Sequence, residues 1–466
     1  MNKEVLKKEM QRVQQDPYRL HYHLMPPMGS LADPNGMCQI GKTTHIYYVH
    51  NPMACLTNER TACVWGHYST EDFVHFQSHP YAIRPDHPSD KDGVYSGSSL
   101  YEDGKLKIIY TGNVRHQGDF DYVFDGREQN VLMVESSDAI CFENKTLLMT
   151  NDDFPGNMTK HVRDPQVFKM DEHYYMVLGA RNQEHQGLAL LYESWDMKHW
   201  QYLNQLTTSQ KFGYMWECPD LIKMNEQMIL ITCPQGVLQD DYHYQNSHQC
   251  GYFMVDGDWK NDAKLSGFNQ FDFGFDFYAA RTFLNDHQER ILIAWMGMSE
   301  ADYTENMTKK NGWMQAIAMP RKLIYKDRHL YQKPIEAMES LRQSHQHIQL
   351  NHGYQVHSLC FECQIDNIDD QDIMIYFKKD CYLKYHQHIL ELNLGTCGDG
   401  RKIRTVELKK LETLHIFSDT SSLEIFINDG YYTMTTRLFD LDDLFCIEAI
   451  KAQADFYELG KYEINY

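Results

Sequence analysis

The chain has 466 residues and 42% of them are hydrophobic, which excludes peptide hormones, small disulfide scaffolds and disordered tails and allows sizeable buried cores. Its 44 basic and 65 acidic side chains give a formal net charge of −21, which argues against nucleic acid or an anionic membrane as a partner. The aromatic share of 13% favours strands over helical bundles, so we expect a β-rich protein.

Residues 1–17 form a charged stretch that predicts a short helix. Because this stretch lacks the apolar core of a signal peptide, and no run of about 20 apolar residues occurs later, we expect a cytoplasmic protein. The twelve cysteines are mostly scattered singly, as expected of reduced thiols in a cytosolic enzyme. The one CxxC, at Cys360 and Cys363, lacks the partners of a zinc module and therefore indicates packing.

Five later segments share one plan, in which an apolar strand, a polar turn and a second apolar strand follow one another. This plan is typical of a β-hairpin. The segments begin at Asp33, Ser96, Arg163, Glu217 and Phe277.

A second pattern follows the first three segments at a distance of roughly 30 to 40 residues, where an outer strand of the same unit would lie. It consists of Thr70, Asp72 and Phe76, and it recurs from Ser136 and from Ser194. Repeated units of about 50 to 65 residues predict an all-β fold with a five-bladed β-propeller, whose first strands line a central channel. The alternative is a long β-sandwich with coincidentally similar strands. In a propeller, one end of the channel would collect Asp33, Ser96, Asp164, Glu217 and Tyr278.

The pattern changes after Pro320. Residues 334–349 predict a helix, and short alternating strands without the earlier period follow, which indicates a β-sandwich. Asp429 and Gly430 predict a hairpin turn between two of these strands. We therefore expect a propeller over residues 1–335, a linker over 336–349 and a β-sandwich over 350–466.

Three acidic residues at the expected mouth of the channel stand out because prolines lie beside them. Asp33 and Asp164 each precede a proline and Glu217 stands two residues before one, and proline should hold the preceding backbone extended. Singly, such motifs are also ordinary turns or surface ion pairs, so their weight comes from sharing one register in different repeats. Three carboxylates at one mouth repel one another, so at least one should have a raised pKa, as a general acid requires.

Acids beside aromatic side chains, without a phosphate loop or metal-ligand spacing, indicate glycoside hydrolysis with no metal or cofactor. One carboxylate would attack or stabilise the anomeric carbon while another protonates the leaving oxygen. Four aromatic residues could stack on a sugar ring or simply pack in a core, namely Trp65, Trp216, Tyr278 and Trp295.

Several stretches, taken in order, identify a known family. They read HYHLMPPMGSLADPNG, VWGHYSTEDFVHF, YSGS, YTGNVR, VRDPQVF, WECPDL, DFGFDFYAART and LEIFINDGYYTMTTRLF. Over nearly its whole length the chain resembles glycoside hydrolase family 32, the invertase group of β-fructofuranosidases. The resemblance implies a five-bladed propeller followed by a β-sandwich, in agreement with the repeats.

The resemblance also implies a retaining double displacement on terminal β-D-fructofuranosides. Asp33 would be the nucleophile, Glu217 the acid/base, and Asp164 would hold fructose hydroxyls and stabilise the transition state. Arg163 would orient Asp164 and lower its pKa, while Glu217 stays protonated. The substrate-binding residues expected beside these acids are Asn35, His50, Trp65, Tyr95, Ser96, Arg163, Tyr278 and Trp295.

The chain departs from the family's pattern at three positions. Ala32 stands where the family usually has asparagine, and His50 and Arg281 each stand where it usually has glutamine. The family's side chains at the first two positions hydrogen-bond fructose, each bond contributing roughly 0.5–1.5 kcal/mol. The departures therefore bear mainly on substrate preference.

A cytoplasmic relative typically meets sucrose as its 6-phosphate, so we expect sucrose 6-phosphate ahead of sucrose and short fructo-oligosaccharides. A phosphate would need local basic contacts against the net charge of −21, and Arg281 and His50 are the candidates. The alternatives are a related, often inverting, propeller glycosidase for arabinose- or xylose-containing oligomers, and a sugar-binding propeller without catalysis. We expect no nucleic-acid or membrane partner, and proteins of this group can pair as homodimers.

Overall fold

Strands make up most of the regular structure. The computed structural model describes residues 3–57, 61–301, 303, 306–378 and 380–466. Helix α1 covers Lys3–Gln14, where the sequence predicts a helix, and α2 is one turn at Asn306–Lys309. Within the described ranges, none of the helices reaches the length and hydropathy of a bilayer span. Short 3-10 turns lie at Asn151–Asp153, Leu350–His352 and Gly395–Gly398.

The first sheet combines the N-terminal hairpin with segments from far along the chain. Its antiparallel strands are β1 (Gly29–Ile40), β2 (Thr43–Asn51), β3 (Val64–Thr70) and β4 (His75–Ser78). β20 (Trp313–Met314) pairs in parallel with β1, and β36 (Glu463–Asn465) pairs in parallel with β4. The C-terminal end of the chain is thus attached to the sheet with which the fold begins.

Four further antiparallel sheets follow in chain order. The second contains β5 (Val94–Glu102), β6 (Lys105–Arg115), β7 (Arg127–Ser136) and β8 (Glu143–Met149). The third contains β9 (Met158–Met170), β10 (His173–Asn182), β11 (Gly187–Ser194) and β12 (Gln201–Leu206). The fourth contains β13 (Met215–Met224), β14 (Gln227–Gln235), β15 (Gly251–Asp256), β16 (Lys264–Leu265) and β17 (Asn269–Gln270). The fifth contains β18 (Tyr278–Leu284), β19 (Arg290–Met296), β21 (Ala316–Ile317), β22 (Arg321–Lys326) and β23 (His329–Pro334).

All five predicted hairpins are confirmed, and each opens its sheet. The second sequence pattern forms the turn after the third strand. Thr70 Oγ1 accepts a hydrogen bond from the amide of Asp72 at 3.2 Å, and the Asp72 carboxylate accepts one from the amide of His75 at 2.8 Å. Equivalent bonds recur around Asp138 and Asp196, so the motif turns the chain by local side-chain to backbone bonding.

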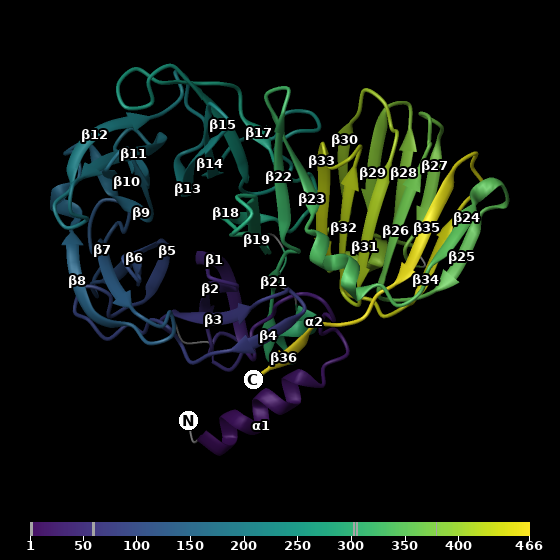
Figure 1. The fold of residues 1–466 in the computed structure, drawn as a ribbon, viewed down its shortest axis with the longest axis horizontal. Coiled ribbons are helices and arrows are strands. Elements are labelled where there is room, and N and C mark those ends of the chain that lie inside the picture. Colours follow the sequence, from purple (N-terminus) through teal and green to yellow (C-terminus); the bar gives the residue numbers. More distant parts are fainter. Residues whose placement is uncertain (1–2, 58–60, 302, 304–305, 379) are drawn as a thin grey trace.

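The first strands of the five sheets contact one another in a closed ring. β1 contacts β5, β5 contacts β9, β9 contacts β13, β13 contacts β18, and β18 contacts β1. Figure 1 shows the five sheets around this ring with their first strands innermost. Because these sheets are separate and meet at their first strands, the alternative of one long β-sandwich does not describe this part of the chain.

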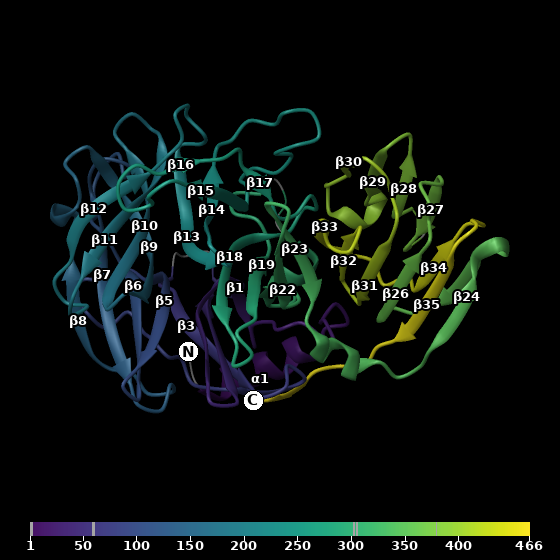
Figure 2. The same ribbon diagram turned by 45° about the horizontal axis from the view of Figure 1, so that its top comes forward.

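Two six-stranded sheets form the C-terminal part, where the sequence predicts a β-sandwich, and Figure 2 shows them beside the ring. Their inner faces share one core, in which the rings of Phe361 and Phe445 lie 4.4 Å apart between centroids. The predicted turn is confirmed, with Asp429 and Gly430 at φ angles of 60° and 83°. One sheet has the order β24 (Gln346–Gln349), β35 (Gln453–Glu458), β26 (Phe361–Asp366), β31 (Leu414–Asp419), β32 (Ser422–Ile427) and β33 (Tyr432–Arg437). The other has the order β25 (Tyr354–His357), β34 (Leu444–Ile447), β27 (Ile373–Tyr376), β28 (Tyr382–His386), β29 (Ile389–Asn393) and β30 (Ile403–Glu407).

The helix predicted over residues 334–349 is wrong. Only Glu336–Leu341 is helical, as a 3-10 helix that ends where Arg342 adopts φ −65° and ψ 121°. Residues 346–349 form β24, whose backbone pairs with β35 at the edge of the sandwich. Backbone pairing with an existing sheet outweighs the local helical preference of this segment.

Candidate active site

A one-residue bulge interrupts the first strand of each of the five ring sheets. In β1, the three steps from Leu31 to Pro34 lie opposite the two steps from His50 to Tyr48. A bulge bends its strand and re-aims the neighbouring side chains, and bulges are frequent beside active sites. The same shift occurs between Val94 and Gly97, Arg163 and Gln166, Glu217 and Asp220, and Tyr278 and Arg281.

The three acids lie at these bulges, but at successive positions. Asp33 is the second residue of its bulge, Asp164 is the first of its own, and Glu217 immediately precedes its bulge. The expectation that the acids share one register is therefore wrong: relative to the bulge, Asp33 and Asp164 differ by one position, and so do Asp164 and Glu217. The consequence is that each carboxylate meets a different set of partners.

Side chains from neighbouring sheets connect the acids across the ring, as the convergence prediction requires. Ser96 Oγ donates a hydrogen bond to the Asp33 carboxylate. Tyr278 donates its hydroxyl to Glu217 Oε2 at 2.7 Å. Between these two pairs lies Asp164, which is buried, whereas Asp33 and Glu217 are half-buried and remain reachable from solvent.

Asp164 and Cys218 depart from the extended backbone that their following prolines predict. Their φ angles are 63° and 48°, in the left-handed region that non-glycine residues rarely adopt. Two bonds hold this conformation, because the Asp164 amide donates to Thr111 Oγ1 at 2.8 Å and the Cys218 amide donates to Asp164 Oδ2 at 3.0 Å. Such strain persists only where the surroundings enforce it, and it is typical of functional sites.

Asp33 is held by the second sheet and by its own neighbour. The Asn35 amide group donates to the backbone carbonyl of Asp33 at 2.9 Å, while Asn35 Oδ1 accepts the amide of Gly97 at 3.0 Å. Asn35 is fully buried, and its two bonds tie the backbone at Asp33 to the second sheet. Burial, together with the negative charges of Asp164 and Glu217, raises the pKa of Asp33 to about 6 against the opposing bond from Ser96.

Glu217 is the carboxylate that binds Arg163. Nη2 and Nε of Arg163 donate to Glu217 Oε1 at 2.6 and 3.1 Å, whereas the approach of Nε to Asp164 is 3.8 Å. Burial alone would raise the pKa of Glu217, but the charge and bonds of Arg163 outweigh it and hold this pKa below its ordinary value. The charge of Arg163 does act to lower the pKa of Asp164, as expected, but its hydrogen bonds go to Glu217, so the expectation that Glu217 stays protonated is wrong in this structure.

Asp164 shows the opposite shift. Burial and the charge of Glu217 raise its pKa despite the nearby Arg163. The predicted raised pKa is thus confirmed, but on Asp164 and Asp33. Together the three acids can hold and exchange a proton within one mouth, which is the property that acid/base chemistry requires.

The aromatic residues predicted to line the sugar site differ in their exposure. Trp65 is fully buried, and its Nε1 donates to the carbonyl of the half-buried Tyr95 at 3.0 Å. Trp295 is 8% exposed and stands edge-on to Tyr278 with centroids 6.3 Å apart. Trp216 is fully buried in a core cluster shared with third-sheet residues, so it is not a sugar platform.

His50 and Arg281, the two side chains considered for a phosphate, are both buried. Nδ1 of His50 donates to the carbonyl of Ser30 at 2.9 Å, and burial lowers its pKa to about 4, so the ring is neutral at physiological pH. Arg281 donates to the carbonyls of Pro219 and Asp164 at 2.5 and 3.1 Å and thereby ties two bulges together. His50 is 1% exposed and Arg281 is 3% exposed, so neither can receive a phosphate.

Two residues that contact the carboxylates of the acids escaped the sequence analysis. Gln235 donates to Glu217 Oε2 at 2.8 Å, and only the register of β13 against β14 brings it there. Cys218 lies inside its bulge, where its amide bonds Asp164 and its Sγ lies 3.6 Å from Asp33 Oδ2. Its position directly after Glu217 was the available signal for Cys218.

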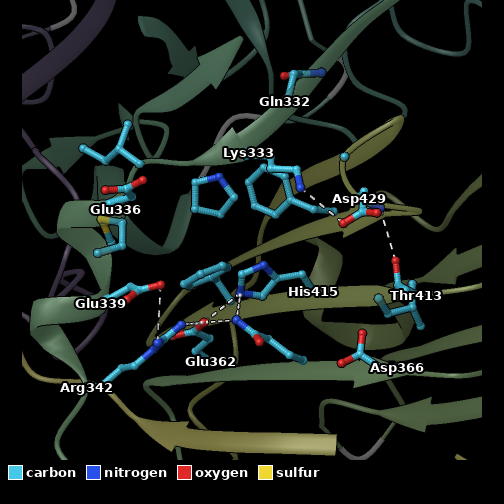
Figure 3. Close-up of a pocket in the computed structure, with 18 residues that line it drawn as sticks. Gln332, Lys333, Glu336, Glu339, Arg342, Glu362, Asp366, Thr413, His415 and Asp429 are labelled. Atoms are coloured by element: carbon cyan, nitrogen blue, oxygen red, sulfur yellow. Dashed lines mark hydrogen bonds and ion pairs between the residues drawn. The ribbon is translucent and has the colours of Figure 1, made fainter. Parts of the chain in front are cut away.

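A separate cavity of about 350 Å³ lies between the fifth sheet and the sandwich (Figure 3). Its most deeply placed charge is Glu362, which accepts two bonds of 2.7 Å from Arg342 and one of 2.8 Å from His415. None of the predicted catalytic residues lines this cavity. Across the described ranges, no three His, Cys, Asp or Glu side chains are grouped so that they could hold a metal ion.

Known proteins share this fold and these motifs. The model described as "Glycosyl hydrolases family 32 N-terminal domain" matches residues 23–334, and "Glycosyl hydrolases family 32 C terminal" matches residues 387–459. A sucrose-6-phosphate hydrolase of Bacillus subtilis (strain 168) is 34% identical over 445 residues, covering 91% of this chain and 89% of that protein. A raffinose invertase of Escherichia coli is 31% identical over 450 residues, covering 91% and 90%. A solved sucrose-6-phosphate hydrolase from Lactobacillus gasseri superposes with a TM-score of 0.90 at 28% identity, covering 99% of this chain and 97% of that one.

Proposed function

Because the chain belongs to glycosyl hydrolase family 32, we propose that this glycosidase hydrolyses terminal β-D-fructofuranosides, with sucrose 6-phosphate as its preferred substrate. The observation that carries the proposal is the meeting of Asp33, Asp164 and Glu217 at one mouth of the ring, each with its own hydrogen-bond partners. Carboxyl groups on both sides of a glycosidic bond are what this hydrolysis requires.

In the proposed mechanism, Asp33 attacks the anomeric carbon of the fructosyl unit while Glu217 gives its proton to the leaving glucosyl oxygen. The product is a fructosyl ester on Asp33 and a free leaving group. Glu217 then takes a proton from water, which attacks the same carbon and releases Asp33. Two inversions at one carbon retain the β configuration.

The partners of the acids support these roles. Ser96 fixes one oxygen of Asp33 and leaves the carboxylate half-buried, so the other oxygen can face a substrate. Tyr278 and Gln235 hold Glu217 Oε2 at 2.7 and 2.8 Å and thereby orient the acid/base. Preorganised carboxylates of this kind need little rearrangement when charge develops at the anomeric carbon.

Asp164 is proposed to hold fructose hydroxyls and stabilise the charge of the transition state. It is buried at the centre of the mouth, and its backbone is locked by Thr111 while the amide of Cys218 fixes its Oδ2. Arg163, which binds Glu217, is proposed to orient the acid/base and to stabilise the carboxylate that remains after Glu217 has given its proton to the leaving group. Trp295 and the half-buried Tyr95 are the aromatic side chains most able to meet the sugar.

The five ring sheets are proposed to be the blades of a five-bladed β-propeller over residues 1–335, joined by residues 336–349 to a β-sandwich over 350–466. The closed ring of first-strand contacts and the identical bulge in all five first strands support this architecture. A cytoplasmic location and a homodimer complete the proposal. Buried free thiols, such as those of Cys218, Cys233 and Cys363, fit a reducing compartment.

The pH dependence of kcat/KM should reflect the proton that the acids share. Attack requires an ionised Asp33 and a protonated Glu217, so the active form carries one proton on this pair. Because the pKa of Asp33 is raised to about 6 and that of Glu217 is lowered from its ordinary value of 4.5, forms with one proton on the pair dominate between the two values, and the active arrangement is a constant fraction of these forms. We expect kcat/KM to fall about tenfold per pH unit above pH 6. On the acid side it should begin to fall only below pH 4.5.

The variant Ser96→Ala tests whether Asp33 or another group causes the alkaline limb of the kcat/KM profile. The Ser96 bond lowers the pKa of Asp33, so its removal should move the alkaline limb of the kcat/KM profile to higher pH. An alkaline limb that stays in place in Ser96→Ala would show that a group other than Asp33 controls it.

The choice of substrate is tested by kcat/KM for sucrose 6-phosphate, sucrose and 1-kestose on the purified protein. We expect sucrose 6-phosphate to exceed sucrose by roughly tenfold or more, the contribution of one charge-assisted bond to phosphate. Equal values with and without the phosphate would contradict this order. Sucrose is the second candidate, because the burial of His50 and Arg281 removes the two basic groups first considered for a phosphate.

A further inference from the structure

Three arginine side chains gather around one histidine beside the acid/base, and we call Arg127, Arg163 and Arg181 the arginine cluster. Arg163 Nη1 donates to His161 Nδ1 at 2.8 Å, and Nη1 of Arg127 lies 3.3 Å from Nε2 of the same ring. Arg163 also donates to Glu217 at 2.6 Å. The cluster therefore starts at Glu217 and continues away from it through His161.

Positive charge dominates this place. Burial, followed by the charges of Arg163, Arg127 and Arg181, lowers the pKa of His161 to about 2. The histidine is thus neutral at physiological pH, whereas guanidinium groups stay charged. Such a concentration of positive charge is notable in a chain whose net charge is −21.

Two of the three arginines of the cluster are partly exposed. Arg127 is the first residue of β7, and Arg181 is the last but one of β10, whose end pairs with the half of β9 that contains Arg163. The guanidinium of Arg181 stands 4.7 Å from the ring centre of Tyr214, which is three residues before Glu217. Arg163 is buried, but Arg127 and Arg181 are half-buried, so the outer part of the cluster is accessible.

No carboxylate neutralises Arg181. Its Nε and Nη2 donate to Nδ1 of His185 at 3.1 and 2.8 Å, and within the described part of the chain it forms no ion pair. The carboxylate whose charge acts on it is that of Asp121, an exposed residue that accepts the amide of Val123 at 3.0 Å. An anion placed beside Arg181 would therefore gain a charge-assisted bond without breaking an existing ion pair.

The chemistry of the reaction places a particular anion here. Glu217 protonates the leaving oxygen, so the leaving group lies on the side of Glu217, where the arginine cluster begins. In sucrose 6-phosphate this leaving group carries the phosphate. The negative net charge of the chain repels a phosphate. Salt screens the attraction of any basic group that lies more than about 8–10 Å away, so only contacts within the site can capture the phosphate.

We propose that Arg127 and Arg181 bind the phosphate of sucrose 6-phosphate in a leaving-group subsite next to Glu217. This subsite rests on the proposed function, since a phosphorylated β-fructofuranoside is the substrate that would use it. It takes the role first considered for His50 and Arg281, which are buried. Arginine suits the role because its planar fork matches two phosphate oxygens at once.

The test is the ratio of kcat/KM for sucrose 6-phosphate to kcat/KM for sucrose, measured for the wild type, Arg127→Gln and Arg181→Gln. Each substitution should lower the ratio about 10- to 100-fold, which corresponds to losing one charge-assisted bond to phosphate. Arg328→Gln is the matched control, because this exposed arginine is paired with Asp256 at the end of β15. Its ratio should equal that of the wild type.

The outcomes separate the subsite from the proposed function. A wild-type preference for the phosphorylated sugar that survives in Arg127→Gln and Arg181→Gln would overturn the subsite alone. A wild-type ratio near one would overturn the substrate order, and the subsite with it.

A second measurement, which needs no variant, is the inhibition of sucrose hydrolysis by glucose 6-phosphate and by glucose. Glucose 6-phosphate should inhibit the wild type at a concentration roughly tenfold lower than glucose does. Equal inhibition by the two sugars would contradict a phosphate contact on the leaving-group side.

Discussion

Replacing Asp33 with asparagine should lower kcat for sucrose 6-phosphate hydrolysis by about 10⁴-fold or more. The amide cannot form the fructosyl ester that divides the reaction into two steps. Asparagine keeps the size of the side chain and can still accept a bond from Ser96, so the fold should persist. Initial rates of the purified variant, together with its thermal midpoint, measure both properties.

Two further variants serve as a control and as a comparison for Asp33→Asn. Asp103→Asn makes the same substitution at an exposed turn between β5 and β6 and should leave kcat at the wild-type value. Glu217→Gln should lower kcat by about 10²–10⁴-fold, the usual contribution of general acid/base catalysis. If Asp33→Asn keeps a rate within tenfold of the wild type, Asp33 is not the nucleophile.

Arg321→Met should lower the free energy of unfolding by about 3–5 kcal/mol, because it removes a buried guanidinium that pairs with two buried carboxylates. Arg321 is fully buried on β22, where Nη2 donates at 2.6 Å to both Glu424 and Thr435 of the sandwich. Nη1 lies 3.4 Å from Asp272, which is also buried. The network therefore joins the ring sheets to the sandwich. Urea unfolding followed by tryptophan fluorescence measures the loss.

The second variant of this series separates lost attraction from stranded charge. Arg321→Met combined with Glu424→Gln should be less destabilised than Arg321→Met alone, because the double change also removes one of the two buried carboxylates that lose the guanidinium. Arg328→Met breaks a solvent-exposed pair with Asp256 and should leave the urea midpoint unchanged. Wild-type stability in Arg321→Met would contradict a structural role for the network.

The ring hairpins were predictable because each follows a local rule. Apolar alternation on both sides of a polar turn specifies two paired strands, and the repeat of this pattern specifies five sheets. The turn around Asp72 is also local, since its bonds reach only three residues along the chain. Residues 346–349 escaped prediction because their conformation depends on β35, a strand about a hundred residues later.

The candidate site shows the same division. The identity of Asp33, Asp164 and Glu217 was visible in their motifs, but their bulges were not, because a bulge is a property of pairing between two strands. The proline rule failed at Asp164, where bonds from outside the segment impose a left-handed backbone. Arg163 was assigned to its sequence neighbour, yet the ring brings Glu217 of the next sheet closer to its guanidinium.

The phosphate contacts that we propose were the least predictable part. Arg281 and His50 were considered because they depart from a family pattern. Both are buried, and both donate hydrogen bonds to backbone carbonyls. Arg127 and Arg181 lie on strands of two different sheets, and no motif links them in the sequence. Only the folded ring brings their charges to the same histidine.

The anomer of fructose that is released first tests most directly whether Asp33 opens a retaining double displacement. NMR spectra recorded during the early turnover of sucrose 6-phosphate, before mutarotation equilibrates the product, identify this anomer. A covalent fructosyl ester followed by attack of water predicts β-fructofuranose as the first product. The α anomer appearing first would mean a single displacement by water and would contradict the role of Asp33 as nucleophile.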